Sequence, residues 1–376
     1  MPVKILFACG GTAGHINPAL AVAGLLREQW PDVQILFAGN PKGMEAKLVP
    51  AAGYDFAPIE VLGFQRKLSL HNIKNNVMAL RYLLTASKKA RRIIEDFSPD
   101  VCMGTGGYVS GPVVRMAAKM KIPTLTHEQN AFPGMTTKLL CKYVDKVLLA
   151  VGQARQFLPG APNVVVTGNP VRREILTADR EKSRQKLGVG DKICILSFGG
   201  SLGAKKINEA IAEVIAQNYD KGMIHHIHAT GQYGAELFPE LLREKGVDIN
   251  DAKNIDLRTY IDDMPDCLAA ADLVICRAGA LSISELQAVG RAAILIPSPN
   301  VAGNHQHYNA RLLESRNAAI LIEEKDLATG RLAQAIQELC ADPQKLQDIG
   351  RSAASMAITD ASQRICKEIE QLLHKF

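Results

Sequence analysis

The sequence contains no cysteine pair at the spacing of a zinc site or a redox centre. Its eight cysteines lie at least nine residues apart, and no Cys-x-x-Cys occurs in the 376 residues. Zinc knuckles and the disulfide frameworks of small secreted proteins both depend on closely spaced, paired cysteines. The cysteine pattern excludes both, and we expect eight free thiols in a reducing compartment.

Long apolar runs are also absent. No stretch reaches the roughly 18 to 20 apolar residues of a membrane-spanning helix, and residues 5–9 are too short for the core of a signal peptide. We therefore expect neither export nor a membrane span. Aromatic residues make up only 5% of the chain, but 47% hydrophobic and 22% charged residues are ordinary for a packed globular protein. This composition excludes disordered and collagen-like chains.

Two parallel sheets are predicted, because short β-branched apolar runs alternate with amphipathic segments along the whole chain. A length of 376 residues exceeds the roughly 250 to 300 that one core supports. The expected strands are residues 4–9, 34–38, 101–104, 123–126, 146–150 and 164–166 in the first half, then 192–198, 223–229, 254–259, 273–276 and 293–297. We predict an α/β fold of two Rossmann-like, doubly wound domains with a central cleft. They span residues 1–167 and 168–359, and a last helix, 360–376, crosses back to the first.

Each half opens with a buried strand, a Gly-Gly-hydroxyl-x-Gly turn and a helix. The two turns are residues 10–14 and 199–203, and a third glycine-rich stretch follows a strand at 104–112. Such turns expose backbone N–H groups beside the positive end of a helix dipole and therefore attract phosphate. Tight strand-to-helix packing is their alternative role. Neither the dinucleotide fingerprint nor the P-loop spacing is present, so NAD binding and ATP hydrolysis are not expected.

Positive charge is concentrated in the first half of the chain. Up to residue 165 there are 19 Lys and Arg against 10 Asp and Glu, whereas the remainder has 25 against 28. Residues 61–94 hold eight basic residues, no acid, and apolar residues at helical spacing. This pattern fits either a solvated basic face or a surface that docks on anionic lipid. Nucleic acid is disfavoured, because the stretch has few aromatic residues and no nucleic-acid module surrounds it.

A divalent metal is not expected. Paired aspartates that could hold such an ion beside a nucleotide are missing, since no Asp-x-Asp occurs. His225, His226 and His228 cluster in sequence, but neighbours on a strand point to opposite faces and would not ligate one ion together.

Seven motifs in a fixed order carry a family resemblance. They are residues 10–18, 106–112, 127–130, 168–172, 199–204, 277–285 and 304–306. Together they resemble the lipid II-forming N-acetylglucosaminyltransferases of peptidoglycan synthesis, over nearly the whole chain. One departure is Ala13, which stands where many relatives have glycine and slightly limits the freedom of the backbone.

The resemblance implies a GT-B fold and an inverting transfer. N-acetylglucosamine would move from UDP-N-acetylglucosamine to the 4-hydroxyl of N-acetylmuramoyl-pentapeptide on pyrophosphoryl-undecaprenol, converting lipid I to lipid II. The acceptor would bind the first domain and the donor the second. The protein would work without a cofactor, as a peripheral protein on the cytoplasmic face of the cell membrane. Its partners would be both substrates, the anionic membrane surface and other proteins of cell-wall synthesis.

The same resemblance implies the binding residues. In the first domain they are Thr12, Ala13, Gly14 and Asn130, with Gly106, Gly107 and Tyr108 as an acceptor loop. In the second they are Arg172, Ser201, Ile261, Ala280, Leu281, Ser282, Ile283, Ser284, Glu285 and Gln306.

Several of these residues have implied roles. Ser201 would donate to the α-phosphate, and Ile261 would contact uracil through its backbone. Gln306 and Asn130 would bind sugar hydroxyls. For Glu285, the residues alone leave two roles open: a first-turn acid that complements the helix dipole, or an acceptor for ribose hydroxyls. The resemblance favours the ribose.

His15 and Glu128 are the candidate catalytic residues. His15 ends the first glycine loop at a helix N-terminus, where the dipole disfavours imidazolium and leaves a neutral ring able to accept a proton. It could alternatively cap that turn. Glu128 is the other candidate base, or a group that orients the base.

Three other functions remain open from the sequence. The first is a glycolipid synthase that adds a sugar to diacylglycerol. The second is a UDP-N-acetylglucosamine 2-epimerase on the same scaffold, which would need no basic membrane face. The third is a non-catalytic nucleotide-sugar-binding scaffold, which would not need His15.

Overall fold

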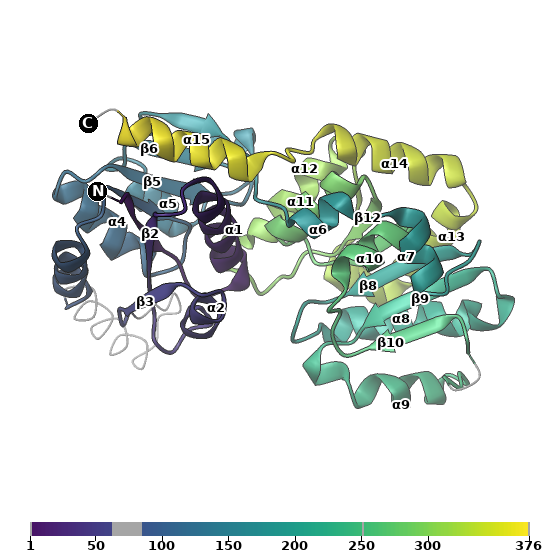
Figure 1. Cartoon of the computed structure of the whole chain (residues 1–376). Helices are drawn as coiled ribbons and strands as arrows, with labels where there is room; N and C mark the ends of the chain where they lie inside the picture. The colour runs from purple at the N-terminus through teal and green to yellow at the C-terminus, as the bar shows by residue number, and fades with distance from the viewer. Residues whose placement is uncertain (1, 62–84, 250–251, 375–376) are drawn as a thin grey trace, which may run out of the picture. The chain divides into compact units, whose positions relative to one another are not determined.

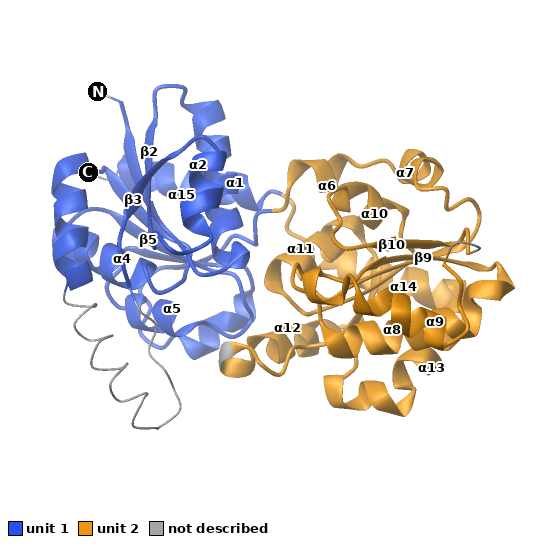
Figure 2. Ribbon diagram, turned by 90° about the horizontal axis from the view of Figure 1, so that it is seen from below, with its two compact units in different colours: residues 1–170, 360–376 blue, residues 171–359 orange. Residues whose placement is uncertain are grey.

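The computed structural model describes residues 2–61, 85–249 and 252–374 (Figure 1). The chain forms two compact units: unit 1 is Met1–Pro170 with Asp360–Phe376, and unit 2 is Val171–Thr359 (Figure 2). The sequence analysis placed the division after residue 167. In the structure it falls after residue 170. Gly168 belongs to unit 1, where its carbonyl oxygen accepts a hydrogen bond from His127 Nε2 at 2.9 Å.

Unit 1 is built on a seven-stranded sheet in the order β3-β2-β1-β4-β5-β6-β7, and every pair of neighbours is parallel. Its strands are β1 (Lys4–Ala8), β2 (Gln34–Gly39), β3 (Asp55–Pro58), β4 (Val101–Gly104), β5 (Thr124–Glu128), β6 (Lys146–Leu149) and β7 (Val164–Val166). The edge strand β3 was not predicted, because its Asp-Phe-Ala-Pro sequence shows neither an apolar run nor clear alternation.

Helices cover both faces of this sheet. They are α1 (Ala13–Gln29), α2 (Glu45–Ala51), a helix over residues 85–97, α4 (Ser110–Lys119), α5 (Met135–Leu140), η1 (Gly152–Phe157) and α15 (Ala361–Leu373). Side chains of β1 alternate between the two faces of the sheet, so the core of unit 1 has two parts. Ile5 and Phe7 pack with α1 and α15 on one face. Leu6 and Ala8 pack with residues 85–97 and α4 on the other. The C-terminal α15 therefore completes the core of unit 1.

Unit 2 repeats the design with a six-stranded parallel sheet in the order β10-β9-β8-β11-β12-β13. Its strands are β8 (Ile193–Phe198), β9 (Ile224–Ala229), β10 (Ile255–Arg258), β11 (Leu273–Cys276), β12 (Ala292–Leu295) and β13 (Ile320–Leu321). Its helices are α6 (Arg173–Thr177), α7 (Arg180–Lys186), α8 (Lys205–Asn218), α9 (Leu237–Glu244), α10 (Met264–Ala270), α11 (Ala280–Val289), α12 (His305–Glu314), α13 (Arg331–Cys340) and α14 (Pro343–Ser355), with short turns η2 (Tyr219–Lys221), η3 (Gln232–Gly234), η4 (Ala302–Asn304) and η5 (Glu324–Thr329). The predicted pair of doubly wound domains is confirmed, although the two-residue β13 was too short to predict.

The strand order reverses once in each sheet. In unit 1, β2 and β3 lie on one side of β1, while β4 and the strands after it lie on the other. In unit 2 the corresponding neighbours are β8 and β11. The loops that leave the two central strands turn in opposite directions and open a crevice between them, which is where ligands bind on open α/β sheets. The three predicted glycine loops follow β1, β4 and β8.

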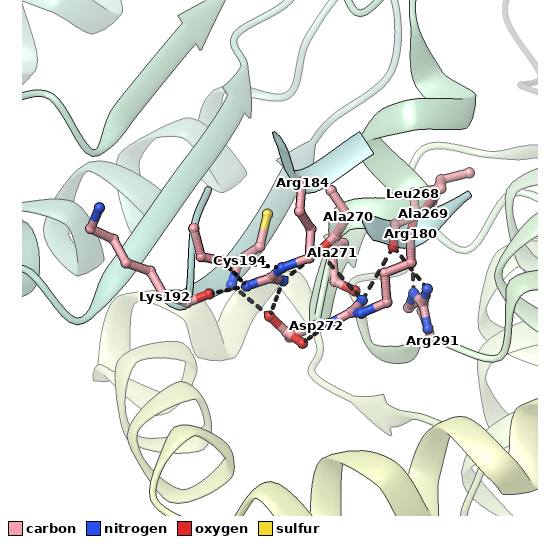
Figure 3. A network of polar contacts seen from close by, with 11 residues as sticks. Arg180, Arg184, Lys192, Cys194, Leu268, Ala269, Ala270, Ala271, Asp272 and Arg291 are labelled. Atoms are coloured by element: carbon pink, nitrogen blue, oxygen red, sulfur yellow. Dashed lines mark hydrogen bonds and ion pairs between the residues drawn. The ribbon is translucent and has the colours of Figure 1, made fainter. Parts of the chain in front are cut away.

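A network of arginines fastens the beginning of β11 in unit 2 (Figure 3). Asp272 accepts hydrogen bonds from Arg180 at 2.5 Å, Arg184 at 3.1 Å and the backbone N–H of Cys194 at 2.8 Å. Arg180, Arg184 and Arg291 also donate to carbonyl groups at the C-terminal end of α10. These carbonyls would otherwise lack partners, and the cations complement the negative end of the helix. Burial lowers the pKa of Arg291 to about 10, and the nearby Arg180 charge acts in the same direction.

The three histidines of β9 are buried. Burial lowers the pKa of His226 to about 4 and that of His228 to about 3, so both rings are neutral near pH 7. His228 Nδ1 lies 2.8 Å from Ser197 Oγ, and its ring packs on Phe238. Within the described ranges, no cluster of His, Cys, Asp and Glu has the arrangement of a metal site.

Part of the basic, apolar segment at residues 61–94 lies outside the described residues, namely 62–84. Its remaining cations, Lys88, Lys89, Arg91 and Arg92, lie on the helix over residues 85–97. Among the residues that the structure describes, none of the helices has the length and apolarity to span a membrane.

Candidate functional site

Two glycine loops of unit 1 meet at the point where its strand order reverses. One follows β1 and the other follows β4, which pairs with β1 up to Ala8 and Gly104. A Cβ atom on Gly107 would lie 2.2 Å from the carbonyl oxygen of Gly10, and Gly107 has a φ of +81°. Glycine is therefore required there both for the backbone conformation and for the close approach of the loops.

The helix after the first loop begins earlier than the sequence indicated. We expected His15 to end the loop, but α1 starts at Ala13 with Thr12 as its N-cap. His15 therefore does not end the loop but lies in the first turn of the helix. Ala13 is helical, which suits alanine, while the positive φ of the loop, +86°, belongs to Gly11. Alanine at position 13 therefore does not restrict the loop, because this position does not require a glycine conformation.

Hydrogen bonds orient the His15 ring. Its Nδ1 lies 3.0 Å from the carbonyl oxygen of Gly10 and 3.3 Å from Thr12 Oγ1. A carbonyl oxygen only accepts, so Nδ1 carries the proton of the neutral ring and Nε2 is the nitrogen that can accept one. The ring packs on the second loop, since a Cβ on Gly106 would lie 2.9 Å from Nε2. The second loop also contacts the first turn of α1, because Thr105 Oγ1 donates to the His15 carbonyl at 2.7 Å.

Two residues that the sequence analysis did not single out hold these loops. Ser110, fully buried, has its Oγ 2.5 Å from the Ala8 carbonyl, and it accepts from the Gly106 N–H at 3.1 Å. Glu45, 1% exposed, accepts from the Gly11 N–H at 3.1 Å. No local pattern marks Glu45 in the sequence, since Lys42 and Lys47 flank it.

Glu128 ends β5 and is saturated with hydrogen bonds. One carboxylate oxygen accepts from the backbone N–H and the side-chain amide of Asn130, both at 3.1 Å. The other accepts from the Gly134 N–H at 2.8 Å and from Thr137 Oγ1 at 2.6 Å. A carboxylate committed to four donors of its own loop is poorly placed to remove a proton. Its geometry favours the orienting role over the role of the base.

Two further side chains of the 127–130 motif connect the loops to the end of unit 1. Gln129 Nε2 donates to the Thr105 carbonyl at 2.8 Å and lies 3.0 Å from His127 Nδ1. On its other side, His127 binds the Gly168 carbonyl, and burial lowers the pKa of this histidine. The sequence analysis assigned no role to either residue; both are structural links beneath the site.

In unit 2 the corresponding crevice lies between the ends of β8 and β11, where Phe198 pairs with Cys276. The loop after β8 contains the exposed Ser201 and leads into α8, whose first turn contains no acid. Gly203 has a φ of +87°, and a Cβ there would lie 2.2 Å from the Thr230 carbonyl. Helices α8 and α11 follow the paired strands β8 and β11, so both begin at the same edge of the sheet, and the N–H groups of a helix start attract an anion.

Helix α11 also begins earlier than predicted. One of the two roles left open for Glu285 places it in the first turn of this helix. The helix starts at Ala280 with Gly279 as N-cap, and no acid lies in its first turn. Ala280, Leu281 and Ser282 therefore supply first-turn N–H groups, and the interpretation of Glu285 as a first-turn acid is wrong.

Glu285 forms an ion pair with Arg172. The Nε and Nη2 atoms of Arg172 both lie 3.0 Å from Glu285 Oε1. Burial raises the pKa of Glu285, and the arginine charge opposes that effect. The glutamate side chain is 18% exposed and the arginine 48% exposed, so the pair faces solvent on the arginine side.

Of the other predicted residues of unit 2, some lie in the core and others make polar contacts within the unit. Ile261 and Ile283 lie in the apolar core, so only their backbone groups face the loops. Gln306, in the first turn of α12, accepts from the Ser298 N–H at 2.8 Å. Ser284 Oγ bonds back to the Ala280 carbonyl at 3.0 Å. Arg277 pairs with Glu324.

Two Rossmann-like units with glycine loops at both reversal points define a GT-B glycosyltransferase. Residues 5–149 match the N-terminal domain model of glycosyltransferase family 28, and residues 194–365 match its C-terminal domain model. The chain therefore belongs to glycosyltransferase family 28.

Individual relatives agree with this assignment. The chain is 44% identical, over 99% of its length and 98% of the relative, to the UDP-N-acetylglucosamine--N-acetylmuramyl-(pentapeptide) pyrophosphoryl-undecaprenol N-acetylglucosamine transferase of Acetivibrio thermocellus. Its structure is similar to that of MurG from Acinetobacter baumannii, with a TM-score of 0.79 and 30% identity over 98% of this chain and 100% of that one. It also shares its fold, at 15% identity and a TM-score of 0.67, with a putative UDP-N-acetylglucosamine 2-epimerase from Listeria monocytogenes, covering 100% of this chain and 98% of that one.

The contact between the two loops of unit 1 can be tested with a pair of alanine substitutions. Gly107→Ala and Gly160→Ala both place alanine at a φ near +80°, but a Cβ on Gly160 meets nothing within 4 Å. Each should cost about 1 to 2 kcal/mol for the left-handed backbone. Gly107→Ala should cost at least about 1 kcal/mol more, because the loops must separate. Urea unfolding followed by circular dichroism measures both; equal losses would contradict the packing described here.

Proposed function

We propose that the chain transfers N-acetylglucosamine from UDP-N-acetylglucosamine to the 4-hydroxyl of N-acetylmuramoyl-pentapeptide on pyrophosphoryl-undecaprenol, with inversion, and so forms lipid II. The observation that carries this proposal is 44% identity over the full length to a relative that bears the name of this activity. Incubation with radiolabelled UDP-N-acetylglucosamine and either lipid I or diacylglycerol tests it. Transfer to lipid I alone is expected; transfer to diacylglycerol, or release of an epimerised sugar nucleotide, would support an alternative.

The donor is assigned to unit 2. The first turns of α8 and α11 offer backbone N–H groups to the diphosphate, with Ser201 in the loop between β8 and α8. The backbone of Ile261 would contact uracil, Gln306 would bind the sugar, and Glu285 would bind the ribose while remaining paired with Arg172. Each oxygen of a carboxylate accepts more than one hydrogen bond, so the pair leaves room for ribose hydroxyls.

The acceptor and the base are assigned to unit 1. His15 Nε2 takes the proton of the 4-hydroxyl as its oxygen attacks the anomeric carbon, and UDP leaves from the opposite face. The glycine loop with Gly106, Gly107 and Tyr108 would receive the acceptor, and Thr12, Ala13 and Gly14 would supply N–H groups at the start of α1. Tyr108 is 58% exposed, which suits a contact with substrate. Glu128 would hold Asn130 in place for a sugar hydroxyl.

Replacing Glu285 with alanine should weaken the binding of UDP as well as that of UDP-N-acetylglucosamine, because both carry the ribose. Loss of a charged hydrogen-bonding partner costs about 1.5 to 3 kcal/mol, which is roughly tenfold to over a hundredfold in Kd. Calorimetric titration measures it. Asp266→Asn is the control, since Asp266 is also an ion-paired carboxylate of unit 2 but lies on α10. Unchanged UDP affinity in Glu285→Ala would contradict the ribose assignment.

Replacing His15 with alanine should preserve UDP-N-acetylglucosamine affinity within a few-fold and reduce kcat by about 10²- to 10⁴-fold, the range that general base catalysis supplies. Steady-state assays with lipid I and donor titration measure the two effects. Near wild-type kcat in this variant would transfer the role of the base to another group, whereas loss of donor binding would make His15 a structural residue of the loop.

We further propose that unit 1 docks on the anionic cytoplasmic surface of the membrane, where the lipid-linked acceptor resides. Met135, Leu139 and Tyr143 are 60%, 60% and 50% exposed and recur every four residues along α5 and the turn after it. Lys138 and Arg115 accompany them, and Arg115 stacks on Tyr143 at 4.5 Å. Exposed apolar side chains with cations beside them are expected to bind anionic lipid. The basic residues at 61–94 belong to the same unit.

Vesicle sedimentation tests this surface. The double substitution of Met135 and Leu139 by serine should reduce binding to anionic vesicles by at least about tenfold, because it removes the apolar contact. Wild-type binding should fall at high salt, which screens the attraction to lipid headgroups. The matched control replaces Met223 and Leu237, 68% and 63% exposed in unit 2, by serine. Equal loss in both double variants, or equal binding to neutral vesicles, would argue against the surface.

A further inference from the structure

Glu45 is a buried carboxylate whose space is created by glycines. It is the first residue of α2 and is 1% exposed. A Cβ on Gly10 would lie 2.2 Å from its Oε1 atom, one on Gly43 would lie 2.3 Å from Oε2, and one on Gly39 would lie 2.5 Å from Cγ. Three glycines, one in the loop after β1, one at the end of β2 and one between β2 and α2, therefore enclose this single side chain, and a Cβ at any of them would collide with it.

The carboxylate is hydrogen-bonded to the backbone of two loops. Oε1 accepts from the Asn40 N–H at 2.9 Å, and Oε2 accepts from the Gly11 N–H at 3.1 Å. A buried charge is costly unless it is hydrogen-bonded, so the position of the Gly11 N–H is tied to that of the carboxylate.

The Gly11 N–H and the Gly10 carbonyl belong to the same peptide group. On its carbonyl side, this group accepts the hydrogen bond from His15 Nδ1 at 3.0 Å. The peptide thus lies between an anion that accepts from its N–H and a ring N–H that donates to its oxygen. Gly107 closes the arrangement from the second loop, because its Cα approaches the same carbonyl.

Hydrogen bonds in such a chain polarise one another. A peptide that donates to a carboxylate becomes a stronger acceptor at its carbonyl oxygen. This favours the proton on Nδ1, and it stabilises the positive charge that the ring acquires when Nε2 takes a proton. The buried aspartate of a Ser-His-Asp triad does the same for its histidine by direct contact. Here one peptide group is inserted between carboxylate and ring.

We infer that Glu45 is a positioning residue that orients His15 and stabilises its protonated form through the Gly10–Gly11 peptide. The inference rests on the proposed role of His15 as the base. The carboxylate itself touches no substrate in this account; it acts through the peptide alone.

The test is Glu45→Gln, which removes the charge and retains the size of the side chain. With ¹⁵N-histidine labelling, the NMR titration midpoint of His15 should fall by about 1 to 1.5 pH units, as expected from the loss of one charge on the far side of a single peptide group at an effective dielectric near 20. The acid limb of the kcat/KM profile should move with it. At pH 7, kcat should fall by about 10- to 100-fold, typical for the loss of a group that orients a reactive residue. UDP affinity should not change.

Two further variants separate charge from structure. Glu45→Asp keeps the charge and should restore the midpoint toward the wild-type value. Asp145→Asn is the matched control, because Asp145 also accepts a backbone N–H in unit 1, from Thr124 at 2.8 Å, but at the other end of β5. It should leave the His15 midpoint and turnover unchanged.

The wild-type protein provides a measurement that does not depend on any variant being folded. The Gly11 amide proton should resonate far downfield and should shift with the His15 titration, and the His15 ¹⁵N shifts should report the Nδ1-protonated tautomer. Failure of Gly11 to follow that titration, or an unchanged midpoint in folded Glu45→Gln, would overturn the inference. If the midpoint moves but His15→Ala retains turnover, the coupling stands and the catalytic role of His15 falls.

Discussion

The parallel pairing of every strand is the constraint on which the rest of the structure depends. A parallel strand cannot return by a hairpin, so each is followed by a crossover that covers one face of the sheet. The carboxyl ends of all strands of a unit consequently lie at the same edge of the sheet. Because the order reverses between β1 and β4 and between β8 and β11, two loops at that edge diverge in each unit and leave room for a ligand. The chain uses this solution twice, and the candidate residues gather at both places.

Glycine sets how closely the loops approach one another. Gly107 lies against the Gly10 carbonyl, and Gly203 lies against the Thr230 carbonyl, in both cases with a positive φ. In unit 1 this contact fixes the peptide to which His15 is bonded. The glycine-rich turns thus serve the packing of one loop on another as well as the exposure of N–H groups, and the two roles are compatible.

Three carboxylates, two buried and one partly exposed, illustrate how surroundings decide a role. Glu45 and Glu128 both accept backbone N–H groups, but only Glu45 is linked through a peptide to His15. Glu285 instead pairs with an arginine that is half exposed. The same functional group therefore organises a loop, accepts from the peptide beside a histidine or pairs with an arginine, according to the donors that the fold supplies.

The sequence by itself determined the α/β class, the two doubly wound units, most strands and the glycine loops. These depend on local patterns, namely apolar runs, helical spacing and turn residues, which persist whatever the chain contacts later. The seven motifs in their fixed order also indicated the family.

Tertiary structure decided the starts of α1 and α11, the edge strands β3 and β13, and the partners of each charged group. Thr12 and Gly279 are residue types that occur at N-caps, but neither makes a side-chain cap bond, so the packing of each loop decides where its helix begins. Glu45 could not be connected to His15 from sequence, because Gly11 and Glu45 are separated by 34 residues and meet only when β1 and β2 pair. Hydrogen bonds between distant segments follow from sheet order and register, and these are properties of the assembled fold.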